Sequence, residues 1–163
     1  MRFIGIDPGI VETAIVIVEQ GGTVLRIKTF LGGSDKDEPR GSRLTPRRLR
    51  QITGPALEEL RPSLSPMTVV AIEEPFVGPN WSTALKTHGV FAVLADVLQE
   101  AVDAGRLRRL LVVAPSTVKR FVGAKKKGTI AREVFKRWKF ESDDHNFVDA
   151  YAIAMWARQE CRD

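Results

Sequence analysis

Apolar residues come in short, strand-like runs over the first part of the chain. Arg2 to Ile6 is a short apolar run, Glu12 to Glu19 is rich in β-branched residues, and Thr23 to Phe30 follows the pair Gly21-Gly22. Two consecutive glycines supply the positive backbone dihedrals of a tight hairpin. The pattern therefore predicts three leading antiparallel strands.

Helical spacing of apolar residues begins after a polar, Gly- and Asp-containing loop that runs from Gly32 to Thr45. The spacing predicts a helix over Pro46 to Leu60, kinked at Gly54-Pro55, and a longer helix from about Trp81 to Ala104, with Leu85 on its apolar face. The other predicted strands are Met67 to Ile72, which should be buried, and Leu110 to Ala114. A short helix over residues 115–121, a helix over residues 129–138 and a last helix from about residue 146 to residue 159 complete the prediction. Strands paired first by hairpins and then by helical crossovers make an α/β fold, a mixed five-stranded sheet flanked by helices.

The length and charge of the chain narrow its function. Its 163 residues, 44% of them hydrophobic, fit one domain spanning residues 1–163. A formal net charge of +5 favours a polyanionic partner. The single cysteine, Cys161, excludes an internal disulfide framework and a thiolate zinc site. No stretch resembles a signal peptide or a membrane span, so we expect a cytoplasmic protein with no membrane partner.

Acidic residues stand where two of the predicted strands end. Asp7 follows the apolar run that ends at Ile6, and Glu73-Glu74 follow the strand that ends at Ile72. Taken alone, Asp7 could equally be a residue that opens a loop. Because neighbouring residues of a strand point to opposite faces, only one glutamate can share a site with Asp7, and we choose Glu73.

A third acid lies inside the last predicted helix. Asp149 of this amphipathic helix is flanked by apolar residues on both sides. Burying its charge without a partner would be costly, and a bound cation removes the difficulty. Asn146 at i−3 and His145 at i−4 share its face, so either could supply a fourth ligand. For Asp143 and Asp144, just before the helix, N-capping is favoured over catalysis.

Oxygen ligands of this kind select hard cations. Mg²⁺ or Mn²⁺ fits a carboxylate set, and the chain lacks the paired cysteines or HExxH spacing that would indicate zinc. Two such ions would activate a water on one side of a phosphodiester and stabilise the departing oxygen on the other. The pattern therefore predicts phosphodiester hydrolysis.

Four short segments together resemble the RuvC-like Holliday-junction resolvases, in that family's order and spacing and over essentially the whole chain. They are Ile4-Gly5-Ile6-Asp7-Pro8-Gly9, Ala71-Ile72-Glu73-Glu74-Pro75-Phe76, Ala114-Pro115-Ser116-Thr117-Val118-Lys119 leading to Val122-Gly123, and Asn146-Phe147-Val148-Asp149-Ala150-Tyr151-Ala152. The resemblance implies a ribonuclease H-like fold, a homodimer, and paired metal-dependent nicks in a four-way DNA junction. It also implies that Asp7, Glu73 and Asp149 bind the metal.

The chain departs from the family's pattern at one ligand. The family has Asp or His three residues before its last acid, whereas this chain has Asn146 there and His145 one place earlier, and we leave open which of the two serves. Lys119 matches the family's first basic residue and could contact the scissile phosphate. The second could be Lys127 or Arg132. The polar loop and the lysine-rich segment resemble a bacteriophage-type or otherwise divergent member, which would act in the host cytoplasm.

Basic segments and one aromatic residue are candidates for DNA contact. We expect two clusters of basic residues to neutralise DNA phosphates, with a merely solubilising surface as the alternative for each. One cluster is Lys125, Lys126 and Lys127, and the other is Arg40, Arg43, Arg47, Arg48 and Arg50. Phe76 could stack on an unpaired base at the centre of a junction, or simply cover the core. By resemblance to the family, the helix from Trp81 onward would form the dimer surface.

Two other functions compete with the endonuclease. Asn146 motivates the first, a catalytically inactive nucleic-acid-binding member of the same fold. The second is an ATP-binding protein of the actin and sugar-kinase type, because residues 5–9 also resemble its first phosphate loop. That class typically needs two such domains, and 163 residues hold one.

Overall fold

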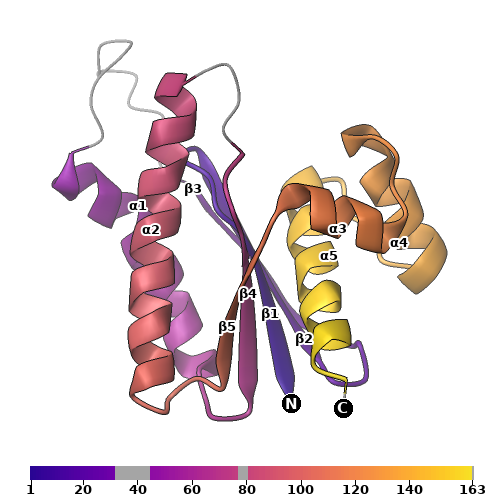
Figure 1. The fold of residues 1–163 in the computed structure, drawn as a ribbon, viewed down its shortest axis with the longest axis horizontal. Coiled ribbons are helices and arrows are strands. Elements are labelled where there is room, and N and C mark those ends of the chain that lie inside the picture. Colours follow the sequence, from indigo (N-terminus) through magenta and orange to yellow (C-terminus); the bar gives the residue numbers. More distant parts are fainter. Residues whose placement is uncertain (32–44, 77–80, 163) are drawn as a thin grey trace.

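A five-stranded sheet in the order β3-β2-β1-β4-β5 forms the centre of the structure, a computed structural model that describes residues 1–31, 45–76 and 81–162 (Figure 1). β1 pairs antiparallel with β2 and β2 with β3, whereas β1, β4 and β5 run parallel. The strands are β1 (Arg2–Asp7), β2 (Glu12–Glu19), β3 (Val24–Leu31), β4 (Thr68–Glu73) and β5 (Arg109–Val113). The predicted fold class, a mixed five-stranded sheet flanked by helices, is confirmed.

Helices cover both faces of this sheet (Figure 1). On one face lie α1 (Pro46–Leu60) and α2 (Trp81–Asp103), and on the other lie α3 (Pro115–Val122), α4 (Ile130–Trp138) and α5 (His145–Glu160). Two 3₁₀ turns, Arg61–Ser63 and Lys127–Thr129, complete the described elements. Alternation along the strands separates two apolar cores: Phe3 of β1 packs on the α5 side, and Ile4 and Ile6 pack on the side of α1 and α2.

Several details of the fold differ from the predictions. β3 and β4 begin and end one residue later than predicted and β5 one residue earlier, so Met67, which is 56% exposed, lies before the buried strand. The pairing of β3 with β2 shifts register between Ile17 and Val18. α1 continues through Pro55 as one helix. Leu85 does not join the core, because its side chain is 63% exposed near the start of α2.

Helix α5 is buried on most of its surface, so the prediction of an amphipathic helix is wrong. Its inner side lies on β1 and β2, and α3 and α4 cover its outer side (Figure 1). The buried residues include Val148, Ala150, Tyr151, Ala152, Ile153, Ala154, Met155 and Ala157. Gly5 makes the close approach possible: a Cβ there would lie 1.9 Å from the carbonyl oxygen of Ala150.

Within the described ranges, no helix has the length and apolar character needed to cross a membrane. The residues at 32–44, which contain Arg40, Arg43 and nearly all of the predicted polar loop, lie outside the described part of the chain.

Candidate active site

The carboxyl ends of β1 and β4 place two acids at the same edge of the sheet. The two strands are parallel neighbours with Ile6 opposite Ile72, so Asp7 and Glu73 follow at matching positions. By alternation, both side chains belong to the face that packs on α5, as Phe3 and Ala71 do. Both residues are half-buried. The next residue, Glu74, is exposed and falls on the opposite face by the same alternation.

The turn that follows Asp7 is held by a buried threonine. The Thr13 hydroxyl donates to the Gly9 carbonyl at 3.1 Å and accepts from the Gly9 amide at 3.3 Å, and Thr13 is fully buried. Gly9 leaves no room for a side chain, since a Cβ there would lie 2.3 Å from the Glu12 carbonyl oxygen. These contacts fix the backbone directly after the candidate ligand.

The N-terminus of α5 is capped as the sequence predicts. The Asp144 carboxylate accepts a hydrogen bond from the Asn146 amide at 2.9 Å, and the Asp144 amide donates to the Ser142 hydroxyl at 3.2 Å. Asp143 is exposed beside it. The cap fixes the first turn of α5, which carries three of the candidate residues.

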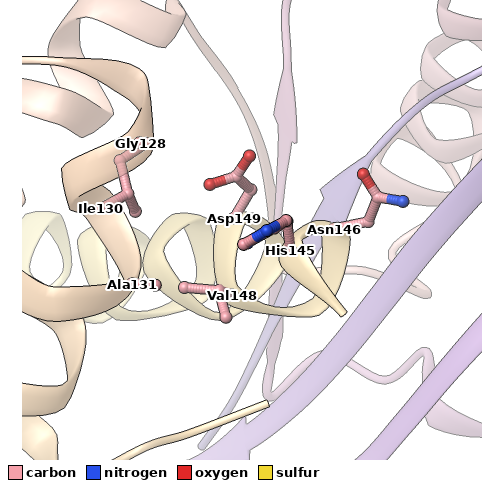
Figure 2. Close-up of a pocket in the computed structure, with 7 residues that line it drawn as sticks. All are labelled: Gly128, Ile130, Ala131, His145, Asn146, Val148 and Asp149. Carbon is pink, nitrogen blue, oxygen red and sulfur yellow. The ribbon is translucent and has the colours of Figure 1, made fainter. Parts of the chain in front are cut away.

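A cavity of about 250 Å³ opens beside this first turn, between α4 and α5 (Figure 2). His145, Asn146 and Asp149 line it from α5, so the structure brings these three predicted residues together. His145 is exposed, whereas Asn146 and Asp149 are half-buried. The remaining lining residues are Gly128, Ile130, Ala131 and Val148.

The donor chemistry of the candidate ligands fits a hard cation, and Asp149 is the only one of the three acids among the residues that line the cavity. Asp7, Glu73 and Asp149 offer only oxygen ligands, which Mg²⁺ and Mn²⁺ prefer. Asn146 adds an amide oxygen and His145 an imidazole nitrogen. Among the residues that the structure describes, no group of three or more His, Cys, Asp and Glu side chains is arranged as a metal site.

The predicted basic and aromatic residues lie outside the cavity lining. Lys119 is half-buried on α3, which begins just after β5 ends. Phe76 is 76% exposed beyond the end of β4. Lys125, Lys126 and Arg132 are exposed cations near the cavity. On α1, Arg47 is exposed and Arg48 is half-buried. The side chain of Lys127 lies outside the described part.

Sequence reasoning did not single out the wall of the cavity that faces α5. Gly128, Ile130 and Ala131 come from the turn and helix after the lysine-rich segment. The Thr129 hydroxyl donates to the Lys126 carbonyl at 2.7 Å and so closes this turn. A glycine followed by a threonine just before a helix is a local signal for this turn. The sequence does not show what the turn faces, because that depends on the packing of α4 on α5.

The sheet begins with antiparallel strands and continues with parallel crossovers, and acids stand at the ends of β1 and β4 and on α5. This combination defines a ribonuclease H-like fold. No protein-family model matches the sequence, and neither does any curated protein.

Solved structures match the chain over almost its whole length. Thermus thermophilus RuvC is 24% identical, with 98% of this chain and 97% of that chain covered at a TM-score of 0.69. T. thermophilus RuvC in complex with a Holliday junction substrate is 25% identical, with coverage of 95% and 91% and a TM-score of 0.67. The yeast mitochondrial Holliday junction resolvase Ydc2 is 13% identical, with coverage of 95% and 78% and a TM-score of 0.59. The chain therefore has the fold of the RuvC-like resolvases, as its four motifs predict.

Proposed function

We propose that this chain is a structure-specific DNA endonuclease that resolves four-way junctions by paired, metal-dependent phosphodiester hydrolysis. The observation that carries the proposal is the similarity to a RuvC solved with a Holliday junction substrate, which covers 95% of this chain. The register of β1 and β4 supports it, since Asp7 and Glu73 share the face that packs on α5. Residues 1–163 would form one nuclease domain that acts on DNA in the cytoplasm.

Three carboxylates and one neighbouring side chain would hold the metal. Asp7, Glu73 and Asp149 are the proposed ligands, with Asn146 or His145 as the fourth. When bound, a pair of Mg²⁺ or Mn²⁺ ions supplies an activated water and stabilises the departing oxygen. His145, which is exposed and lines the cavity, is also proposed as a proton shuttle.

Basic side chains on both faces of the sheet would bind the DNA backbone. Lys119 on α3 is proposed to contact the scissile phosphate. Phe76, which is exposed just after Glu73-Glu74, would stack on an unpaired base at the junction centre. Phosphates of the duplex arms would be neutralised by Lys125, Lys126, Lys127, Arg132, Arg47 and Arg48.

A homodimer would place two such sites on opposed strands of one junction. Helix α2 is the proposed dimer surface, and its exposed Leu85 is available for such a contact. Sedimentation velocity on the purified protein tests this part: a dimer supports it, and a monomer at micromolar concentration contradicts it.

A cleavage assay tests the proposed activity. End-labelled four-way, three-way and linear DNA are incubated with Mg²⁺, Mn²⁺ or Ca²⁺, and paired nicks are expected in the four-way junction with Mg²⁺ or Mn²⁺. Asp7→Asn, Glu73→Gln and Asp149→Asn should each abolish nicking and leave junction binding intact or stronger, because a negative charge close to DNA is removed. Asp143→Asn, an exposed acid just before α5, is the matched control and should nick normally.

Junction binding without any nicking would support the inactive alternative, which Asn146 motivates. Comparing Asn146→Ala with His145→Ala resolves the fourth position, since the variant that removes a ligand should lose activity. Wild-type rates in both would remove both residues from the site.

A further inference from the structure

A second cavity adjoins the first on the outer side of α5. It also has a volume of about 250 Å³ and is lined by Ala131, Arg132, Phe135, Phe140, Glu141, Ser142 and Val148. Ala131 and Val148 line both cavities, so the two adjoin where α4 packs on α5. We call the two cavities together the α4–α5 trough, in which Asp149 lines one cavity and Phe135 lines the other.

Two aromatic rings stand at the outer end of the trough. Phe135 on α4 is 44% exposed and lines the cavity, so part of its ring is open to a ligand. Phe140 is stacked on Tyr151, with ring centroids 4.1 Å apart and an interplanar angle of 6°. Tyr151 is buried in α5 and also meets Trp138 edge-on at 6.0 Å. Phe140 is therefore held in place and is not free to turn and cover Phe135.

Two cations lie beside Phe135, and one acid, the exposed Glu141, also lines the cavity. The Lys139 ammonium lies 5.2 Å from the centroid of Phe135, on a residue that ends α4 in the left-handed conformation with φ of 59°. Arg132 is exposed and lines the trough beside Phe135. The nearest acid of α4, Glu133, already pairs with Arg132 at 3.0 Å and with Lys136 at 3.2 Å.

We propose that the α4–α5 trough binds unpaired nucleotides of a single DNA strand as it leaves the candidate active site. Exposed aromatic rings among cations are the combination that proteins use for single-stranded nucleic acid, because any base can stack and the cations follow the phosphates. Phe135 is the stacking platform, and Arg132 and Lys139 contact the backbone. The inference deepens the proposed function and rests on it for the presence of DNA at Asp149.

The chemistry of the trough favours this occupant over two others. A paired duplex hides the faces of its bases inside the stack, so Phe135 could reach them only in an unpaired strand. An acidic peptide would satisfy the cations, but its carboxylates offer no flat ring to stack on the exposed Phe135, as a base does.

Binding of labelled single-stranded oligonucleotides and of duplex DNA without divalent metal tests the proposal. Phe135→Ala should weaken binding of the single strand by on the order of ten-fold and leave duplex binding unchanged. Phe135→Trp, which keeps a flat ring, should restore it, whereas Phe135→Leu, which is apolar but not flat, should not. Leu25→Ala is the matched control, because Leu25 is 45% exposed on β3 and lies outside the trough.

Three results would overturn the inference: single-strand affinity in Phe135→Ala equal to that of Leu25→Ala and wild type, rescue by leucine as complete as rescue by tryptophan, or an equal loss for duplex. The melting temperature of each variant shows whether it is folded. If Phe135→Ala is unfolded, the comparison of Phe135→Trp with Phe135→Leu tests the inference instead. Nicking of a fully paired junction, measured in parallel, separates the two proposals. If the wild-type protein does not nick the junction, the proposed function is contradicted. Whether the trough binds a single strand is tested by the metal-free binding experiment alone.

Discussion

Gly5 should set the distance between the sheet and the helix that carries Asp149. In Gly5→Ala, the new Cβ would meet the Ala150 carbonyl oxygen at 1.9 Å and the Ala154 amide nitrogen at 2.5 Å. Both contacts are backbone atoms of α5, which cannot turn away as a side chain could. To restore an ordinary 3.4 Å contact, α5 must retreat from β1 by roughly 1.5 Å.

This displacement has a cost in stability and a cost in activity. Overpacking of a well-packed core costs about 3 kcal/mol at the upper end of the usual range, and the buried backbone contact places Gly5→Ala there. A shift of about 1 Å between reacting groups reduces rate by on the order of a hundred-fold. Because Asp149 moves with α5 and Asp7 stays with β1, we expect junction nicking to fall by about that factor even where the variant is fully folded.

Urea unfolding and junction nicking at low temperature measure the two effects separately. Gly21→Ala is the matched control, since nothing lies within 4 Å of a Cβ at Gly21 in the β2–β3 turn. It should unfold and nick as the wild type does. A Gly5→Ala protein with wild-type unfolding midpoint and wild-type nicking would refute the reasoning that this glycine fixes the helix against the strand.

Three further predictions concern single contacts. Glu59→Gln should unfold more easily at pH 7 by on the order of 1 kcal/mol, because Glu59 pairs at 2.6 Å with each of two half-exposed cations of β3. Its pKa is lowered from the ordinary 4.5, mainly by the hydrogen bond from Lys28, so the stabilisation is present above that value and is lost as the pH falls through the folded pKa. Urea unfolding at a series of pH values from 7 downward should show the difference from wild type shrinking in acid. Asp144→Ala removes the N-cap of α5 and should lower the free energy of unfolding by about 1 kcal/mol, whereas Asp144→Asn should lower it much less. Thermal unfolding measures both, and equal losses would exclude capping as the cause. Thr13→Val keeps the shape of the side chain but leaves the Gly9 amide without its hydrogen-bond acceptor, so the free energy of unfolding should fall by about 1–3 kcal/mol. Thr13→Ser should stay closer to wild type in urea unfolding, and an unchanged stability in Thr13→Val would contradict the role of this hydroxyl.

The sheet could be predicted from sequence because its determinants are local. β-branched runs, a Gly-Gly turn and apolar runs that end in an acid each indicate a strand without knowledge of its partner. Strand alternation predicted that only one of Glu73 and Glu74 shares the face of Asp7, and the register of β1 and β4 identifies Glu73 as that residue. The bounds of β3 and the irregular pairing at Ile17 and Val18 were not visible, since both depend on how the two strands pair.

The surroundings of α5 could not be read from its own sequence. Apolar residues on nearly every side are compatible with several arrangements, and only the packing of α3 and α4 on its outer side shows why they are there. The α4–α5 trough escaped prediction for the same reason. Phe135 and Phe140 are ordinary aromatic residues in the sequence, and their exposure and stacking are properties of the tertiary structure.

The central claim is that acids from β1, β4 and α5 bind the same metal ions. A crystal grown or soaked with Mn²⁺, with data collected at a wavelength where manganese scatters anomalously, tests it most directly. The account predicts an anomalous peak whose ligands include carboxylate oxygens of both Asp7 and Asp149, with Glu73 beside them. A well-ordered crystal in which these carboxylates stand apart and no manganese lies between them would contradict it.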